Sequence, residues 1–125
     1  MSQYVIAGIG CRRYCPAEDI LSVVRRACAE TGVFAGGLAA AEFKAHEPGL
    51  RAAAQHLGLP LFLVDTVALS AAQERCMTRS ARAVQAIGIA SIAEGCALAA
   101  AGPDSRLLLP RIAFGAATCA LAAAT

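Results

Sequence analysis

Residues 8–13 have the sequence Gly-Ile-Gly-Cys-Arg-Arg, which combines two glycines, one thiol and two guanidinium groups. They follow residues 4–7, Tyr-Val-Ile-Ala, a short apolar run that is typical of a buried strand. We therefore expect a glycine-rich turn directly after this strand. Glycine lets the backbone approach a ligand closely, and arginine forms forked hydrogen bonds with carboxylates. The segment predicts an anion-binding turn, although a tight turn with two solvated arginines would have the same local pattern.

Three charged residues elsewhere are further candidates for a binding site, namely Lys44, Glu47 and Glu94. Taken singly, Lys44 and Glu47 also fit solvated surface charges. Glu94 stands three residues after Ser91, and this Ser-x-x-Glu spacing predicts a capping box at a helix N-terminus. The local pattern therefore does not decide between a structural role and a ligand-binding role for these residues.

The familiar catalytic and cofactor motifs are absent or incomplete. The glycine pattern of residues 8–13 lacks the third glycine of a dinucleotide-binding fingerprint, because position 13 is arginine. The chain has no Gly-Lys-Ser or Gly-Lys-Thr phosphate loop and no Gly-x-Ser-x-Gly nucleophile elbow. Its 6 cysteines include no Cys-x-x-Cys pair, and His46 and His56 do not share a helix face. We expect no metal site and no cofactor, and the sequence identifies no catalytic residue.

The composition narrows the class of protein. Alanine accounts for 31 of the 125 residues, 16% of residues are charged, and the formal net charge is +2. The arginines form no basic tract and tryptophan is absent, which argues against nucleic-acid binding. Residues 112–125, the longest uncharged stretch at the C-terminus, are fewer than the about 20 apolar residues that span a membrane. With no export signal at the N-terminus, we expect a cytoplasmic protein without membrane association.

The spacing of apolar residues and the positions of glycine and proline predict alternating strands and helices. Strands are expected at residues 4–7, 37–40, 61–64, 106–109 and 117–121. Helices are expected from Pro16 to Gly32, from Pro48 to Gly58, at 65–73 and at 91–101, with helical turns at 83–87. Residues 76–80 would form a loop or a helix start, and residues 110–115 would link the last two strands as a hairpin. The prediction is a single three-layer α/β/α domain over residues 1–125, with a mixed, largely parallel sheet that ends in an antiparallel hairpin.

Several segments, taken in order, resemble one known family. They are residues 8–13, residues 44–50 with Lys44 and Glu47, Gly88 with residues 91–94, residues 107–109 and residues 118–122. Over essentially the whole chain they are similar to the CobE and CbiG C-terminal family of cobalamin biosynthesis, and Gly-Ile-Gly-Cys-Arg is the most specific part. The family commonly has glycine where this chain has Tyr14, and lysine where it has Arg111.

The resemblance implies a small domain that acts during construction of the corrin ring. Longer relatives resemble hydrolases that open a lactone on a cobalt-bound corrinoid precursor, and they carry domains that this chain lacks. Three roles stay open for a stand-alone chain. It could bind or hand over a precorrin or corrinoid intermediate, it could act on that intermediate as a hydrolase or transferase, or it could be a non-catalytic partner of the pathway methyltransferases.

A precorrin is a broad apolar macrocycle edged with carboxylates, and basic side chains beside a glycine-rich cleft would suit that edge. The expected ligand-binding residues are Gly8, Gly10, Cys11, Arg12, Arg13, Lys44, Glu47 and Glu94. The cations would contact carboxylates, the glycines would permit close approach, and the glutamates would orient the basic groups or touch ring nitrogens. The thiol at position 11 is expected to pack in the turn rather than bind a metal.

Overall fold

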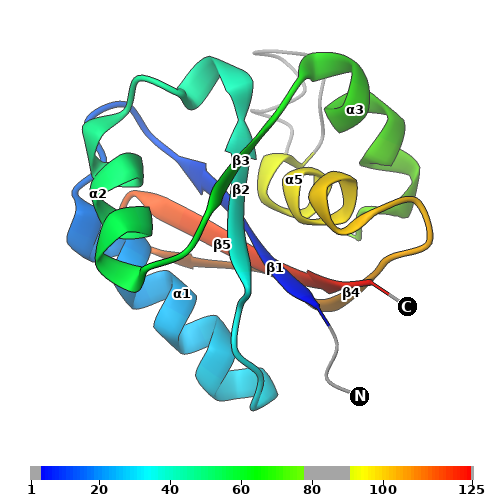
Figure 1. Ribbon diagram of the computed structural model, residues 1–125, viewed down its shortest axis with the longest axis horizontal. Helices are drawn as coiled ribbons and strands as arrows, with labels where there is room; N and C mark the ends of the chain where they lie inside the picture. Colours follow the sequence, from blue (N-terminus) through cyan, green and yellow to red (C-terminus); the bar gives the residue numbers. More distant parts are fainter. Residues whose placement is uncertain (1–3, 78–90, 125) are drawn as a thin grey trace.

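The computed structural model describes residues 4–77 and 91–124. Its centre is a five-stranded sheet in the order β3-β2-β1-β5-β4 (Figure 1). The strands are β1 (Val5–Cys11), β2 (Gly37–Ala41), β3 (Leu61–Val64), β4 (Arg106–Phe114) and β5 (Ala117–Ala123). β1, β2 and β3 run parallel, whereas β5 is antiparallel to both β1 and β4. This confirms the predicted α/β domain with a mixed sheet and a C-terminal antiparallel hairpin.

Helices cover both faces of the sheet. They are α1 (Ala17–Thr31), α2 (Pro48–Leu57), α3 (Thr66–Ala71) and α5 (Ile92–Ala101), with short 3₁₀ turns η1 (Glu42–Lys44) and η2 (Ala72–Arg75). Figure 1 shows α1 and α2 on one face and α3 and α5 on the other. No helix among the described residues is long and apolar enough to cross a membrane. The helical turns expected at 83–87 and the end of the loop expected at 76–80 lie outside the described residues.

The sheet separates two apolar layers because successive residues of a strand face opposite sides. Val5, Ala7 and Ile9 of β1 pack into the layer beneath α1 and α2. Ile6, between them, packs into the layer beneath α3 and α5. All four are at most 2% exposed, which explains why this strand is a continuous apolar run rather than an alternating one.

The predicted helix boundaries are confirmed where a glycine ends a helix or an aspartate begins one. Gly32 and Gly58 end α1 and α2 in the left-handed conformation, with φ of 73° and 67°. Asp65 begins α3, and its side chain accepts a hydrogen bond from the Ala68 N–H at 2.8 Å. The helix expected at 65–73 is shorter than predicted, because η2 replaces its last turn.

Two predicted boundaries in the strands are wrong. The expected turn at residues 8–11 is the second half of β1, which pairs with β5 as far as Cys11 opposite Ala117. The expected link at 110–115 is mostly strand, so that the β4–β5 connection is a tight turn at Gly115, with φ of 57°. Pro110 is accommodated because β4 is an edge strand whose register shifts between Leu109 and Ile112.

Candidate functional site

Most of the candidate residues lie where the parallel strands end. β1 ends at Cys11, and β2 ends directly before η1. Because Ile9 pairs with Ala40 in parallel register, the carboxyl ends of β1 and β2 meet at one edge of the sheet (Figure 1). α1 and α2 also begin at this edge. We call it the carboxyl edge, and ligands of open α/β sheets characteristically bind at such edges.

Gly8 lies in the buried middle of β1, on the side of the sheet that α5 covers. A Cβ atom at this position would collide with the Ala93 carbonyl oxygen and would lie 2.6 Å from the Ala97 nitrogen. The close approach that Gly8 permits in this structure is therefore the approach of helix α5 to the sheet. The sequence alone predicts that Gly8 permits the approach of a ligand instead.

Gly10 is nearer the carboxyl edge and is half-buried. A Cβ atom here would lie 2.5 Å from the Thr118 hydroxyl oxygen and 3.9 Å from the backbone nitrogen of Ala93. Ala93 is the second residue of α5. Thr118 donates a hydrogen bond from its hydroxyl to the Gly10 carbonyl at 3.3 Å. Only the β1–β5 pairing brings Thr118 here, so the sequence alone did not identify it as a site neighbour.

Residues 12–15 form the turn that leaves β1. The Arg12 N–H donates to the Ala116 carbonyl at 3.0 Å, and the Cys15 N–H donates to the Arg12 carbonyl at 3.1 Å. The side chains of Arg12 and Arg13 are exposed. Within residues 4–77 and 91–124, neither guanidinium has a hydrogen bond or an ion pair. Both cations are therefore accessible at the carboxyl edge.

Tyr14 adopts a φ of 63°, a conformation that glycine accepts more readily than any other residue. Its N–H donates to Glu47 Oε1 at 2.8 Å, which joins the turn after β1 to the residue that precedes α2. Gly49 brings these two segments together, because a Cβ atom there would collide with the Cys15 carbonyl oxygen. Glu47 thus holds the turn that carries the two arginines.

Charged groups from both segments influence the cysteines of the edge. Burial raises the pKa of the Cys11 thiol, the Lys44 ammonium lowers it, and the Glu47 carboxylate raises it. Burial likewise raises the pKa of Cys15 to about 11, with smaller contributions from the neighbouring charges. These interactions place the four residues in one electrostatic neighbourhood. Both thiols are protonated at neutral pH, and neither is a reactive thiolate.

Glu94 lies apart from this cluster, because its side chain is directed to β4 and to the segment just after η2. The residue is fully buried, and its carboxylate accepts hydrogen bonds from the Arg111 N–H at 2.9 Å and the Met77 N–H at 2.7 Å. The predicted capping box is wrong, since Ser91 forms no side-chain cap and its hydroxyl has no partner among the described residues. Gln73 instead accepts the Ser91 N–H at 2.9 Å. A buried glutamate satisfies unpaired backbone donors where the register of β4 shifts.

The carboxyl edge also carries two exposed aromatic rings that sequence analysis did not assign to the site. Tyr14 is 81% exposed and Phe43, in the middle of η1, is 50% exposed. In the sequence Tyr14 stands out only as a departure from the family's glycine, and Phe43 belongs to no motif. Their position immediately beside Arg13 and Lys44 in the chain was the available signal.

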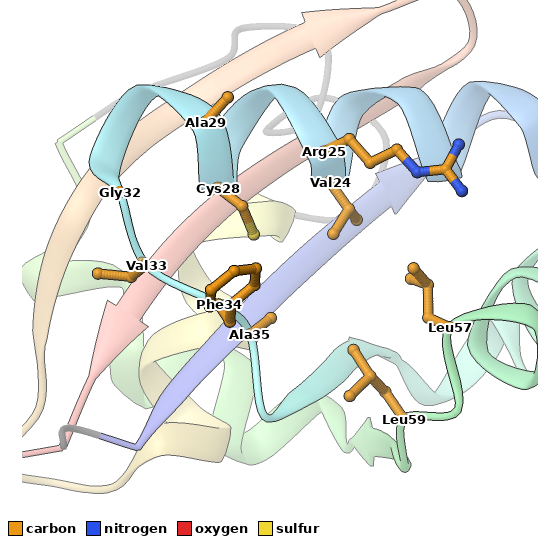
Figure 2. A pocket seen from close by; sticks show the side chains of 10 residues that line it. All are labelled: Val24, Arg25, Cys28, Ala29, Gly32, Val33, Phe34, Ala35, Leu57 and Leu59. Atoms are coloured by element: carbon orange, nitrogen blue, oxygen red, sulfur yellow. The ribbon is translucent and has the colours of Figure 1, made fainter.

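An apolar cavity of about 580 Å³ lies at the other end of α1 and α2 (Figure 2). Val24 and Cys28 line it from α1, Phe34 from the segment before β2, and Leu57 from α2. Figure 2 shows Arg25 at its margin, the one charged side chain that lines it. This cavity is separate from the cluster at the carboxyl edge.

The chain matches a family model described as the cobalamin synthesis G C-terminus over residues 5–122. It is similar to Protein CobE from a Sinorhizobium species, with 36% identity over 121 residues that cover 94% of this chain and 79% of the relative. The match takes in the carboxyl edge, α5 and the C-terminal hairpin together.

Solved structures have the same fold. A crystal structure of CobE, described as a protein from the cobalamin (vitamin B12) biosynthetic pathway, has a TM-score of 0.92 and 34% identity, covering 100% of this chain and 93% of that one. The cobalamin biosynthesis protein chiG from Agrobacterium tumefaciens has a TM-score of 0.79 and 37% identity, covering 97% and 98%. A cobalamin biosynthesis protein G homolog from Sulfolobus solfataricus, at 20% identity and a TM-score of 0.68, is similar in fold over 98% of this chain and 37% of its own.

Proposed function

This chain belongs to the CobE and CbiG C-terminal family of cobalamin biosynthesis, and from that premise we propose that it binds a corrin-ring intermediate at the carboxyl edge. The observation that carries the proposal is the exposure of the Arg12 and Arg13 guanidinium groups at this edge, with the half-buried Lys44 close to Cys11. Corrin intermediates carry carboxylates around an apolar ring, and guanidinium groups pair with carboxylates in two-point hydrogen bonds. The chain would hold the intermediate and pass it on.

Charge favours the carboxyl edge over the apolar cavity as the binding site. The cavity has the volume of a small-molecule pocket, but Arg25 is the one cation among its lining residues. A macrocycle with several carboxylates would bury charges there without partners, at a cost of several kcal/mol for each. At the carboxyl edge the carboxylates would meet cations and remain in contact with water.

Binding is favoured over hydrolysis by the state of the nearby thiols. A cysteine nucleophile reacts as the thiolate, and burial raises the pKa of both Cys11 and Cys15. Lys44 and Glu47 lie close to these thiols, and Glu47 already accepts the Tyr14 N–H. We therefore assign the charged residues of this edge to holding a ligand, and we assign no nucleophile.

The proposal is tested by absorbance titration with cobyrinic acid, a corrin with free carboxylates, and with cobinamide, in which those carboxylates are amidated. The chain is expected to bind the first and not the second. Arg12→Ala is expected to weaken binding about tenfold, the loss of one charge-assisted pair. Arg106→Ala is the matched control, since Arg106 is an exposed arginine at the start of β4. Equal binding of both corrins, or of neither, would contradict the proposal.

A further inference from the structure

The aromatic ring of Tyr14 is exposed to solvent, although the backbone of this residue adopts a conformation that is unfavourable for tyrosine. Its φ of 63° is the left-handed conformation, and its side chain is 81% exposed. Packing of the ring therefore does not compensate for the backbone conformation. Non-glycine residues in such conformations are concentrated at binding and catalytic sites, where the surrounding structure imposes them.

The surrounding structure does impose this conformation. Glu47 Oε1 accepts the Tyr14 N–H at 2.8 Å, and the Arg12 carbonyl accepts the Cys15 N–H at 3.1 Å. These two hydrogen bonds fix the backbone on both sides of the Tyr14 Cα atom. The ring is thus anchored at its base beside Arg13, while its faces stay free.

We propose that Tyr14 is a stacking residue for the ring face of the ligand and that it makes the carboxyl edge selective for planar macrocycles over acyclic polycarboxylates. This inference rests on the proposed function. An aromatic ring attracts a flat conjugated system through its face, whereas a guanidinium attracts a carboxylate at the ligand's edge. Tyr14 and the adjacent arginines would contact these two parts of one ligand.

The test uses two commercially available probes that both carry many carboxylates but differ in shape. Uroporphyrin is a planar macrocycle edged with carboxylates, and hexaglutamate is an acyclic polycarboxylate. Tyr14→Gly removes the ring and suits the observed φ, so the variant is expected to fold. It should bind uroporphyrin about tenfold more weakly, in line with the loss of one stacking contact. Its affinity for hexaglutamate should be unchanged. Tyr14→Phe should bind both probes within about twofold of the parent chain.

Two further variants make the outcome decisive. Tyr14→Asn also tolerates a left-handed φ without an aromatic ring, and should repeat the result of Tyr14→Gly. Phe34→Ala removes a ring that is 91% exposed at the apolar cavity, and should leave both affinities unchanged. Tight uroporphyrin binding by Tyr14→Gly would overturn the stacking role and leave the proposed function standing. Binding of cobyrinic acid but not of uroporphyrin by the parent chain would overturn the selectivity for planar macrocycles alone, and binding of neither compound would overturn both proposals.

Discussion

At the scale of single residues, Glu47 has two effects on the carboxyl edge. It accepts the Tyr14 N–H and so fixes the turn after β1, and its negative charge raises the pKa of Cys11. Lys44 acts on the same thiol in the opposite direction. Burial has the largest effect on this pKa, and the two opposite charges add smaller changes that the reactivity of Cys11 should report.

The first prediction concerns that reactivity. Lys44→Met removes a positive charge and should raise the pKa of Cys11, which lowers its thiolate fraction and slows its alkylation. Glu47→Gln keeps an acceptor oxygen, removes a negative charge and should speed alkylation. We expect changes of about threefold at pH 8, since a full pKa unit corresponds to tenfold. Iodoacetamide labelling followed by peptide mass spectrometry measures each cysteine separately.

Cys28 is the internal control for this experiment, because it lies near the far end of α1 beside the apolar cavity. Its labelling rate should be the same in both variants and the parent chain. If the two variants change the Cys11 rate in the same direction, local unfolding rather than charge determines the reactivity, and the electrostatic account is wrong.

At the scale of elements, the contact between β1 and α5 depends on a missing side chain. Gly8 faces the backbone of α5 at Ala93 and Ala97, whereas Gly10 faces the hydroxyl of Thr118. A backbone atom cannot move without moving the helix, but a threonine side chain can rotate. The two glycines therefore differ in what a methyl group would cost, although they are only two residues apart.

The second prediction follows from this difference. Gly8→Ala is expected to lower the free energy of unfolding by about 2 kcal/mol, since overpacking would displace α5. Gly10→Ala is expected to lower it by less than about 1 kcal/mol. Urea unfolding followed by circular dichroism measures both. Equal losses of unfolding free energy in the two variants would show that α5 is displaced as easily as the Thr118 side chain rotates.

At the scale of the whole molecule, buried thiols link the stability of the fold to pH. Burial raises the pKa of Cys15 to about 11 and that of Cys96 to about 12, and it also raises the pKa of Cys119. These thiols occupy both apolar layers of the sandwich. The ordinary pKa of a cysteine thiol is 9.0. Above this pH the unfolded chain releases thiol protons that the folded chain retains.

The third prediction is a loss of stability in alkali. A group whose pKa is raised on folding contributes its full stability below the unfolded value, and that contribution is lost as the pH rises toward the folded value. The free energy of unfolding in urea with reductant should fall between pH 9 and 10.5, by about 1.5 kcal/mol for each of the three thiols.

Cys119→Ala provides the control for this titration. The variant starts from a lower stability at pH 8 because it loses packing, but its further loss between pH 9 and 10.5 should be smaller by about a third. A parallel decline in the parent chain and in Cys119→Ala would assign the alkaline transition to groups other than the buried thiols.

Local sequence signals are enough to predict the order of strands and helices along the chain, most helix ends and the family resemblance. These depend on local chemistry, because Gly32 and Gly58 end helices through their own backbone freedom and Asp65 caps α3 with its own side chain. The apolar run of residues 61–64 corresponds to the whole of β3. Such signals act within a few residues and can be recognised without knowing what packs beside them.

Which residues are neighbours across the sheet, and therefore which groups each candidate contacts, depends on the three-dimensional packing of the strands and helices. The segment at 8–11 is strand rather than turn because β5 pairs along it. The absence of a side chain at Gly8 lets α5 approach the sheet closely, because this helix crosses β1 at that residue. Glu94 was expected to cap its own helix, but β4 presents an unpaired N–H to it. Pairing between segments far apart in the chain has no local signature, since each contact depends on both partners at once.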